Sequence, residues 1–207
     1  MPGSLRRLAG TVALKLGGWE VAPLRGQPPK SIMLGYPHTS NWDFVWLKAS
    51  SWHYGIDISF LGKRELFRGP LGWLLTALGG VPVDRAGSGQ MVERMAKEFA
   101  SRERLVLCIP PEGTRHYVET WRSGFYHMAV AAKVPLQLSL LDYARRHIEV
   151  SEPIDLTGNI AADMDRIRAF YAGAKGRFPE QTGAVRLKEE GSGLLLVGQG
   201  GFEPPTT

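Results

Sequence analysis

The sequence has one cysteine, Cys108, among its 207 residues. A single cysteine cannot form a disulfide within the chain, which excludes a disulfide-stapled scaffold and suits a reducing compartment. Because Cys108 lies inside the apolar run LVLCIP, we expect a buried thiol rather than a nucleophile. The motif G-x-S-x-G, which exposes a nucleophilic serine at a strand-to-helix turn, is also missing. A hydrolase with a serine or cysteine nucleophile is therefore poorly supported.

Metal-binding patterns are missing as well. The five histidines are scattered, without an H-E-x-x-H motif and without the paired cysteines of a structural zinc site. The formal net charge is +5, but the sequence shows no basic stripe interleaved with aromatic residues deeper in the chain. We therefore expect no metal and no nucleic-acid partner. No cofactor is expected either.

Long apolar runs are missing too. The segment LRRLAGTVALKL near the N-terminus has 12 residues, whereas a membrane-spanning helix needs about 20. Acidic residues are scarce here, since residues 1–30 hold five basic side chains and one acidic side chain, Glu20. The segment resembles an amphipathic helix, with Leu14 as an exception. Its apolar side is predicted to hold Leu5, Leu8, Ala9, Val12, Ala13 and Leu16, and its polar side Arg6, Arg7, Thr11 and Lys15.

Two interpretations of this helix stay open. A basic amphipathic helix can lie in the surface of an anionic membrane, with Trp19 just beyond the end of the helix. It can equally pack its apolar side on the domain as a core helix. The first interpretation predicts a peripheral or monotopic protein on the cytoplasmic face of the cell membrane.

Beyond the linker APLRGQPPK, apolar runs alternate with helix-length segments. This rhythm predicts a single α/β domain with a mainly parallel central sheet flanked by helices. We expect residues 1–30 to form the basic amphipathic segment and linker, residues 31–187 the domain, and residues 188–207 a poorly ordered tail. Asn159 is expected to cap a final helix over residues 161–174.

Polar residues follow four of the expected strands directly. If these strands are parallel, their carboxyl ends meet at one edge of the sheet, where ligands bind in open α/β folds. A base, an acid and several cations at one edge suit an anionic, phosphorylated substrate. The polar residues are His38 and Asp43 after 31–36, Lys63 and Arg64 after 56–62, Asp84 and Arg85 after 80–83, and Glu112, Thr114 and Arg115 after 105–111.

The stretch PHTSNWDF spans residues 37–44 and supports two compatible interpretations. Ser40 and Asp43 fit a capping box, with Ser40 as N-cap and Asp43 at N3. His38 lies just ahead of that helix, where the Asp43 carboxylate can reach one ring nitrogen. A carboxylate in this position fixes the imidazole tautomer and stabilises the imidazolium formed after proton abstraction.

Four blocks between residues 31 and 143 occur in a recognisable order. They are HTSNWD, then GGVPVDR preceded by GKRELFRGPLG, then PEGTR, then VPLQLSL. A lone H-x4-D pair recurs by chance, but the four blocks together, with PEGTR intact, are specific. The sequence resembles the lysophospholipid and glycerophosphate acyltransferases, of which 1-acyl-sn-glycerol-3-phosphate acyltransferase is typical.

The resemblance implies transfer of a fatty acyl group from a thioester, on coenzyme A or acyl carrier protein, to a lysophospholipid hydroxyl. The acceptor it implies is 1-acyl-sn-glycerol-3-phosphate, in phospholipid biosynthesis, and no covalent enzyme intermediate is expected. His38 would be the general base, and Asp43 would orient it. The acceptor phosphate would lie on Arg85 and Lys63. The acceptor pocket would be shaped by Glu112, Gly113, Thr114 and Arg115, with Arg115 as a second phosphate contact.

Departures from the family pattern leave the acceptor open. Pro37 stands where many members have asparagine, and Trp42 is bulky. Another lipid or glycolipid acceptor, or a non-catalytic lipid-binding protein of the same fold, therefore stays an alternative. Four leucines on one predicted helical face could line an acyl-chain groove or belong to the core. These are Leu71, Leu74, Leu75 and Leu78.

Overall fold

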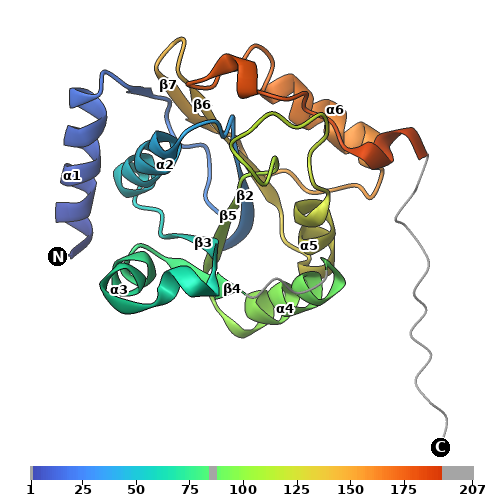
Figure 1. The fold of residues 1–207 in the computed structure, drawn as a ribbon, viewed down its shortest axis with the longest axis horizontal. Helices are drawn as coiled ribbons and strands as arrows, with labels where there is room; N and C mark the ends of the chain where they lie inside the picture. The colour runs from blue at the N-terminus through green and yellow to red at the C-terminus, as the bar shows by residue number, and fades with distance from the viewer. Residues whose placement is uncertain (1, 84–87, 193–207) are drawn as a thin grey trace, which may run out of the picture.

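One sheet runs through the middle of the protein (Figure 1). The computed structural model describes residues 2–83 and 88–192, and in this part seven strands pair in the order β1-β7-β6-β2-β5-β3-β4. The strands are β1 (Glu20–Val21), β2 (Lys30–Tyr36), β3 (Ile58–Lys63), β4 (Gly80–Val83), β5 (Leu105–Ile109), β6 (Leu136–Asp142) and β7 (His147–Val150).

Strands β2 to β6 all run in the same direction. Only at one side of the sheet does the direction change, because β7 pairs antiparallel with β6 and β1 pairs parallel with β7. The mainly parallel α/β sheet predicted from the alternating pattern is thus confirmed. The ends of β2, β3, β4 and β5 lie at one edge, as the sequence predicted.

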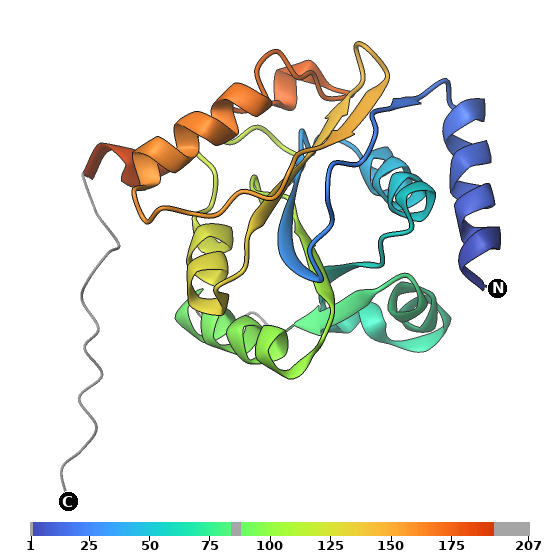
Figure 2. The ribbon, with the colours of Figure 1, turned by 180° about the vertical axis from the view of Figure 1, so that it is seen from behind.

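Helices cover both faces of the sheet. Figures 1 and 2 show α1, α2 and α3 on one face and α4, α5 and α6 on the other. Short 3-10 helices, η1 (Arg64–Phe67), η2 (Pro179–Gln181) and η3 (Lys188–Ser192), complete the described chain. The α-helices are α1 (Pro2–Leu16), α2 (Asn41–Tyr54), α3 (Gly69–Ala77), α4 (Ser88–Ser101), α5 (Gly124–Ala132) and α6 (Ile160–Phe170).

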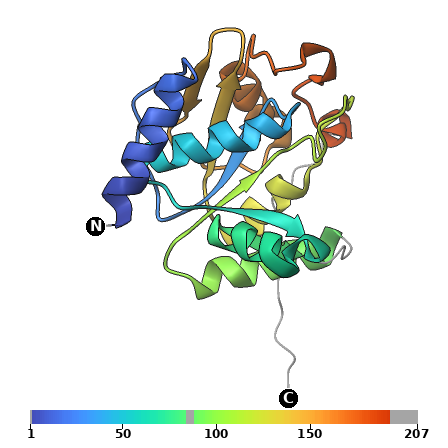
Figure 3. The same cartoon turned by 60° about the vertical axis from the view of Figure 1, so that its left-hand side comes forward.

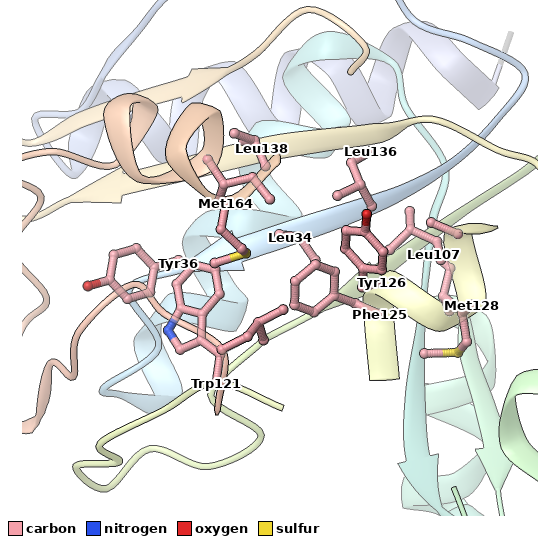
Figure 4. Close-up of a cluster of buried hydrophobic side chains, with 14 of the residues drawn as sticks. Leu34, Tyr36, Leu107, Trp121, Phe125, Tyr126, Met128, Leu136, Leu138 and Met164 are labelled. Carbon is pink, nitrogen blue, oxygen red and sulfur yellow. The ribbon is translucent and has the colours of Figure 1, made fainter. Parts of the chain in front are cut away.

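The larger hydrophobic core lies between the sheet and helices α4, α5 and α6. Leu34 of β2, Leu138 of β6, Phe125 of α5 and Met164 of α6 are enclosed there (Figure 4). Side chains on β2 alternate between the two faces, as they must in a strand. A smaller cluster on the opposite face therefore contains the neighbouring Met33, together with Ile58 and Cys108. The Cys108 thiol is buried, as predicted.

The expected helix ends are confirmed in two places. Ser40 and Asp43 form both halves of a capping box at the start of α2. Asn159 caps α6, where its side-chain oxygen accepts a hydrogen bond of 3.2 Å from the Ala162 N–H. The helix ends at Phe170, earlier than the predicted residue 174.

Helix α1 packs on the outside of α2 (Figure 3), but not through the apolar side that the core-helix interpretation expected. Gly10 and Leu14 are buried against the domain. The small Gly10 allows close approach, since a Cβ there would lie 2.4 Å from the Ala49 carbonyl oxygen. Thr11 also faces inward, with its hydroxyl 2.9 Å from His53 Nδ1. Most of the predicted apolar stripe consequently faces outward, with Leu16 85% exposed, whereas Ala13 packs against the domain.

Helix α3 also leaves apolar side chains at the surface. Leu71 and Leu74 are exposed, and Trp73 is 76% exposed. The interpretation of Leu71 and Leu74 as core residues is therefore wrong. Gly72 is the buried residue of this helix, because it lies against the backbone of Phe67 at the end of η1.

Some predicted features lie outside the described residues. These are Asp84 and Arg85 after β4, and the part of the expected tail that covers residues 193–207.

Candidate active site

The loop between β2 and α2 folds around the Asp43 carboxylate. The backbone N–H groups of Thr39 and Ser40 each donate a hydrogen bond of 2.7 Å to Asp43 Oδ2. In return, Ser40 Oγ accepts a hydrogen bond of 3.2 Å from the Trp42 N–H. These bonds satisfy backbone donors that the first turn of a helix leaves free. Asp43 is buried, and its carboxylate lies next to the His38 side chain.

His38 lies against this carboxylate. Its Nδ1 is 3.3 Å from Asp43 Oδ2, and its side chain is 23% exposed, whereas that of Asp43 is 5% exposed. An ionised carboxylate can only accept a hydrogen bond, so this contact assigns the proton of a neutral imidazole to Nδ1. Nε2 then carries the lone pair that can accept a proton. The geometry predicted from the spacing of His38 and Asp43 is present.

Glu112 holds the backbone of His38. Because β2 and β5 are neighbours in the sheet, the segments that follow them meet. The His38 N–H donates a hydrogen bond of 2.8 Å to Glu112 Oε2. Glu112 is 1% exposed, and burial raises its pKa to about 8, opposed by the His38 hydrogen bond and supported by the nearby Asp43 charge. Protonated Glu112 is therefore the main form at neutral pH.

A tight turn shapes the other wall of the site. The Gly113 N–H donates a hydrogen bond of 3.0 Å to the Pro110 carbonyl oxygen. Gly113 has a φ of 69°, a left-handed conformation that favours glycine, so the turn predicted from Pro110-Pro111-Glu112-Gly113 is confirmed. A cavity of about 290 Å³ opens between this turn and the β2–α2 loop. It is lined by His38, Pro110, Gly113, Thr114, Arg115 and His116.

The cationic residues predicted for the site do not all line this cavity. Arg115 lines the cavity and its guanidinium also contacts the side chain of Asn41, the first residue of α2. Lys63 is exposed at the end of β3, at the same edge of the sheet, but it is not among the residues that line this cavity. Arg85 lies outside the described residues. The structure therefore brings His38, Asp43, Glu112, Gly113, Thr114 and Arg115 together.

The arrangement suits proton abstraction from a bound hydroxyl. A histidine oriented by a buried carboxylate lines the cavity beside a cationic side chain. Nothing in the cavity lining offers a serine or cysteine nucleophile. Within residues 2–83 and 88–192, no three His, Cys, Asp or Glu side chains gather closely enough to hold a metal ion.

A family model described as Acyltransferase matches residues 29–137, which is more than half of the chain. The chain belongs to the Acyltransferase family. The matched segment includes His38, Asp43 and the PEGTR block, so the resemblance inferred from the four sequence blocks is confirmed. The prediction of an acyltransferase is confirmed at the level of the family.

Among solved structures, this acyltransferase is similar to the 1-acyl-sn-glycerophosphate (LPA) acyltransferase PlsC from Thermotoga maritima. The TM-score is 0.50 at 18% sequence identity, with 75% of this chain and 70% of that chain covered. At this identity the likeness shows the fold alone, and it agrees with the predicted α/β architecture. No curated protein matches the chain.

Two further residues of the acyltransferase reach the site without having been predicted. His116 lines the cavity, and its place directly after PEGTR was a signal that could have indicated it. Tyr143 donates a hydrogen bond of 2.7 Å from its hydroxyl to Asp43 Oδ1. It follows β6 directly, so the rule that ligand-binding residues follow parallel strands could have pointed to it.

Proposed function

We propose that the protein transfers a fatty acyl group from an acyl thioester to a hydroxyl of a lysophospholipid. The observation that supports this most directly is the pairing of His38 with the buried Asp43 in a cavity of an Acyltransferase family member. The acceptor proposed is 1-acyl-sn-glycerol-3-phosphate, and the donor is acyl-coenzyme A or acyl-acyl carrier protein. The reaction would belong to phospholipid biosynthesis.

In the proposed mechanism, His38 Nε2 takes the proton of the acceptor hydroxyl while the hydroxyl oxygen attacks the thioester carbonyl carbon. The new carbon–oxygen bond forms, the carbon–sulfur bond breaks, and the leaving thiolate receives the proton from the imidazolium. Asp43 stabilises the imidazolium in between. A thioester is already activated for acyl transfer. One general base and the correct positioning of the two substrates are therefore sufficient for the reaction. No cofactor takes part.

The cation at the cavity is proposed to hold the acceptor phosphate. Arg115 lines the cavity and presents a planar guanidinium, which suits bidentate contact with phosphate oxygens. Lys63, at the end of β3, and Arg85 are proposed as additional phosphate contacts. Glu112 would support the pocket by holding the His38 backbone, and Gly113 and Thr114 would shape its wall.

The protein is further proposed to act at the membrane surface, on the cytoplasmic face of the cell membrane. No helix in the described part of the chain is long and apolar enough to cross a bilayer. The outward apolar side of α1 supports surface binding, because Leu5, Leu8, Val12 and Leu16 are all exposed. Lys15 and the exposed Arg6 suit anionic headgroups, although Arg6 also lies 3.6 Å from Asp57, whereas Arg7 donates a hydrogen bond to the Tyr54 carbonyl oxygen. Lipid substrates would then be collected from the membrane itself.

The proposal is tested by offering the purified protein several donors and acceptors. Radiolabelled acyl-coenzyme A and acyl-acyl carrier protein are each combined with lysophosphatidate, lysophosphatidylcholine, monoacylglycerol and a glycolipid. We expect acylated product with lysophosphatidate, and much less with monoacylglycerol, which lacks the phosphate. Product with a glycolipid alone would establish the alternative acceptor. Binding without product for every pair would support a non-catalytic lipid-binding protein.

A further inference from the structure

The two oxygens of the Asp43 carboxylate have different partners. Oδ2 accepts both backbone hydrogen bonds of the capping box and also faces His38 Nδ1. These contacts all involve one oxygen of the carboxylate. Oδ1 accepts its hydrogen bond from the Tyr143 hydroxyl, at 2.7 Å. The carboxylate is thus held at both oxygens, and Tyr143 supplies the side-chain hydrogen bond to the oxygen that does not face His38.

Tyr143 is itself held from two sides. Its ring packs edge-on against Trp19, with the ring centroids 5.0 Å apart at an angle of 82°. Its backbone N–H donates a hydrogen bond of 3.0 Å to the Lys175 carbonyl oxygen. Burial, together with Asp43, raises the pKa of the Tyr143 hydroxyl, so that it stays protonated and remains a donor. A rigid donor is thus aimed at Asp43.

We propose that Tyr143 is a positioning residue for acyl transfer: its hydroxyl orients the Asp43 carboxylate so that Oδ2 stays aligned with His38 Nδ1. This inference rests on the proposed function of His38 as the base. Tyr143 lies beyond residues 29–137, the segment that the family model matches. Asp43 therefore accepts a hydrogen bond from a residue that lies outside the segment matched by the family model.

The first test is kinetic and uses Tyr143→Phe, which removes the hydroxyl and keeps the ring against Trp19. With lysophosphatidate and oleoyl-coenzyme A, we expect kcat to fall about 10- to 100-fold, the range of a hydrogen bond to a charged group. KM for both substrates should stay unchanged, because Tyr143 does not line the cavity. The matched control is Tyr54→Phe, which removes a hydroxyl that donates a 2.6 Å bond to the Ala22 carbonyl oxygen.

A double-mutant comparison separates positioning from a general structural effect. If Tyr143 acts through Asp43, adding Tyr143→Phe to Asp43→Asn should lower kcat little further. A structural effect would instead lower kcat by the same factor in both backgrounds. That result would overturn the proposal.

The second test needs no catalysis. The tautomer of the His38 imidazole in the full-length protein is measured by nuclear magnetic resonance of its ring nitrogens, with the His38 signals assigned through His38→Gln. We expect Tyr143→Phe, but not Tyr54→Phe, to increase the population of the Nε2–H tautomer. An unchanged His38 spectrum in Tyr143→Phe overturns the proposal, as does an unchanged kcat in an active enzyme. Wild-type protein without acyl transfer would contradict the proposed function, and the spectrum would still decide the role of Tyr143.

Discussion

Glu112 combines deep burial with an incomplete set of hydrogen bonds. Its Oε2 accepts from the His38 N–H, whereas its Oε1 is buried and has no hydrogen-bond partner in the described part of the chain. An ionised carboxylate in this position would lack much of the stabilisation that water gives. The protonated form is the less costly one, which is why burial raises the pKa of Glu112 to about 8.

This pKa predicts how stability depends on pH. Between pH 4.5, its ordinary pKa, and about pH 8, the folded protein binds this proton and the unfolded chain does not. The free energy of unfolding therefore falls as pH rises through this window, by on the order of a few kcal/mol. Glu112→Gln keeps an acceptor for the His38 N–H but cannot ionise. We expect the stability of the wild type relative to Glu112→Gln to decrease as pH rises.

Urea unfolding of both proteins at several pH values measures this difference. The histidines of the two proteins are the same, so their titration cancels in the comparison. A stability difference that stays constant from about pH 5 to about pH 8 would show that Glu112 is ionised in the folded protein.

The packing of α1 on α2 depends on a glycine. A Cβ at Gly10 would lie 2.4 Å from the Ala49 carbonyl oxygen and 2.8 Å from the His53 N, so α1 would have to move away. We expect Gly10→Ala to lower the free energy of unfolding by roughly 1–3 kcal/mol, the usual cost of overpacking. Gly3→Ala is the matched control in the same helix, because nothing lies within 4 Å of its added Cβ. Urea unfolding measures both changes, and equal stability of the two variants would contradict the packing described.

The helices and strands themselves could largely be predicted from the sequence. Apolar runs such as LVLCI become buried parallel strands, because helices cover both faces of the sheet. The two-residue strand β1 gave no comparable signal, since Glu20–Val21 is too short for a pattern. In α1 the apolar spacing left open whether the apolar side faces the domain or a membrane surface. The contact with α2 depends instead on the small Gly10 and on Thr11, which the spacing did not indicate.

The candidate site was predictable where its residues are close in sequence or follow neighbouring strands. Asp43 and His38 are five residues apart, and the capping box places them together. Glu112 joins them because β2 and β5 are adjacent. The contact of Tyr143 with Asp43 spans 100 residues and depends on the strand order, which the sequence pattern does not specify.

The face of the protein that carries α1 and α3 exposes several large apolar side chains. Leu5 is 71% exposed, and Leu8 and Trp73 are exposed as well. The two helices cover the same face of the sheet (Figure 1). An exposed apolar surface combined with basic residues is typical of proteins that bind anionic membranes.

Sedimentation with anionic vesicles tests this surface. We expect the double variant Leu5→Ser and Leu8→Ser to bind at least about tenfold more weakly, because each buried leucine contributes about 1.5–3 kcal/mol. Added salt should weaken the binding of the wild type through screening of its basic residues. The control is Val130→Ser, which changes an exposed apolar residue of α5 on the opposite face of the sheet. Equal binding of all three proteins would show that α1 does not contact the membrane.

The proposed acyl transfer depends on His38 as the base, and its replacement tests this most directly. His38 is partly exposed at the cavity, so His38→Ala should leave the urea midpoint and vesicle binding nearly unchanged. With lysophosphatidate and oleoyl-coenzyme A as substrates, we expect kcat to fall about 10²–10⁴-fold, the contribution of a general base. Undiminished turnover by purified His38→Ala would contradict the mechanism.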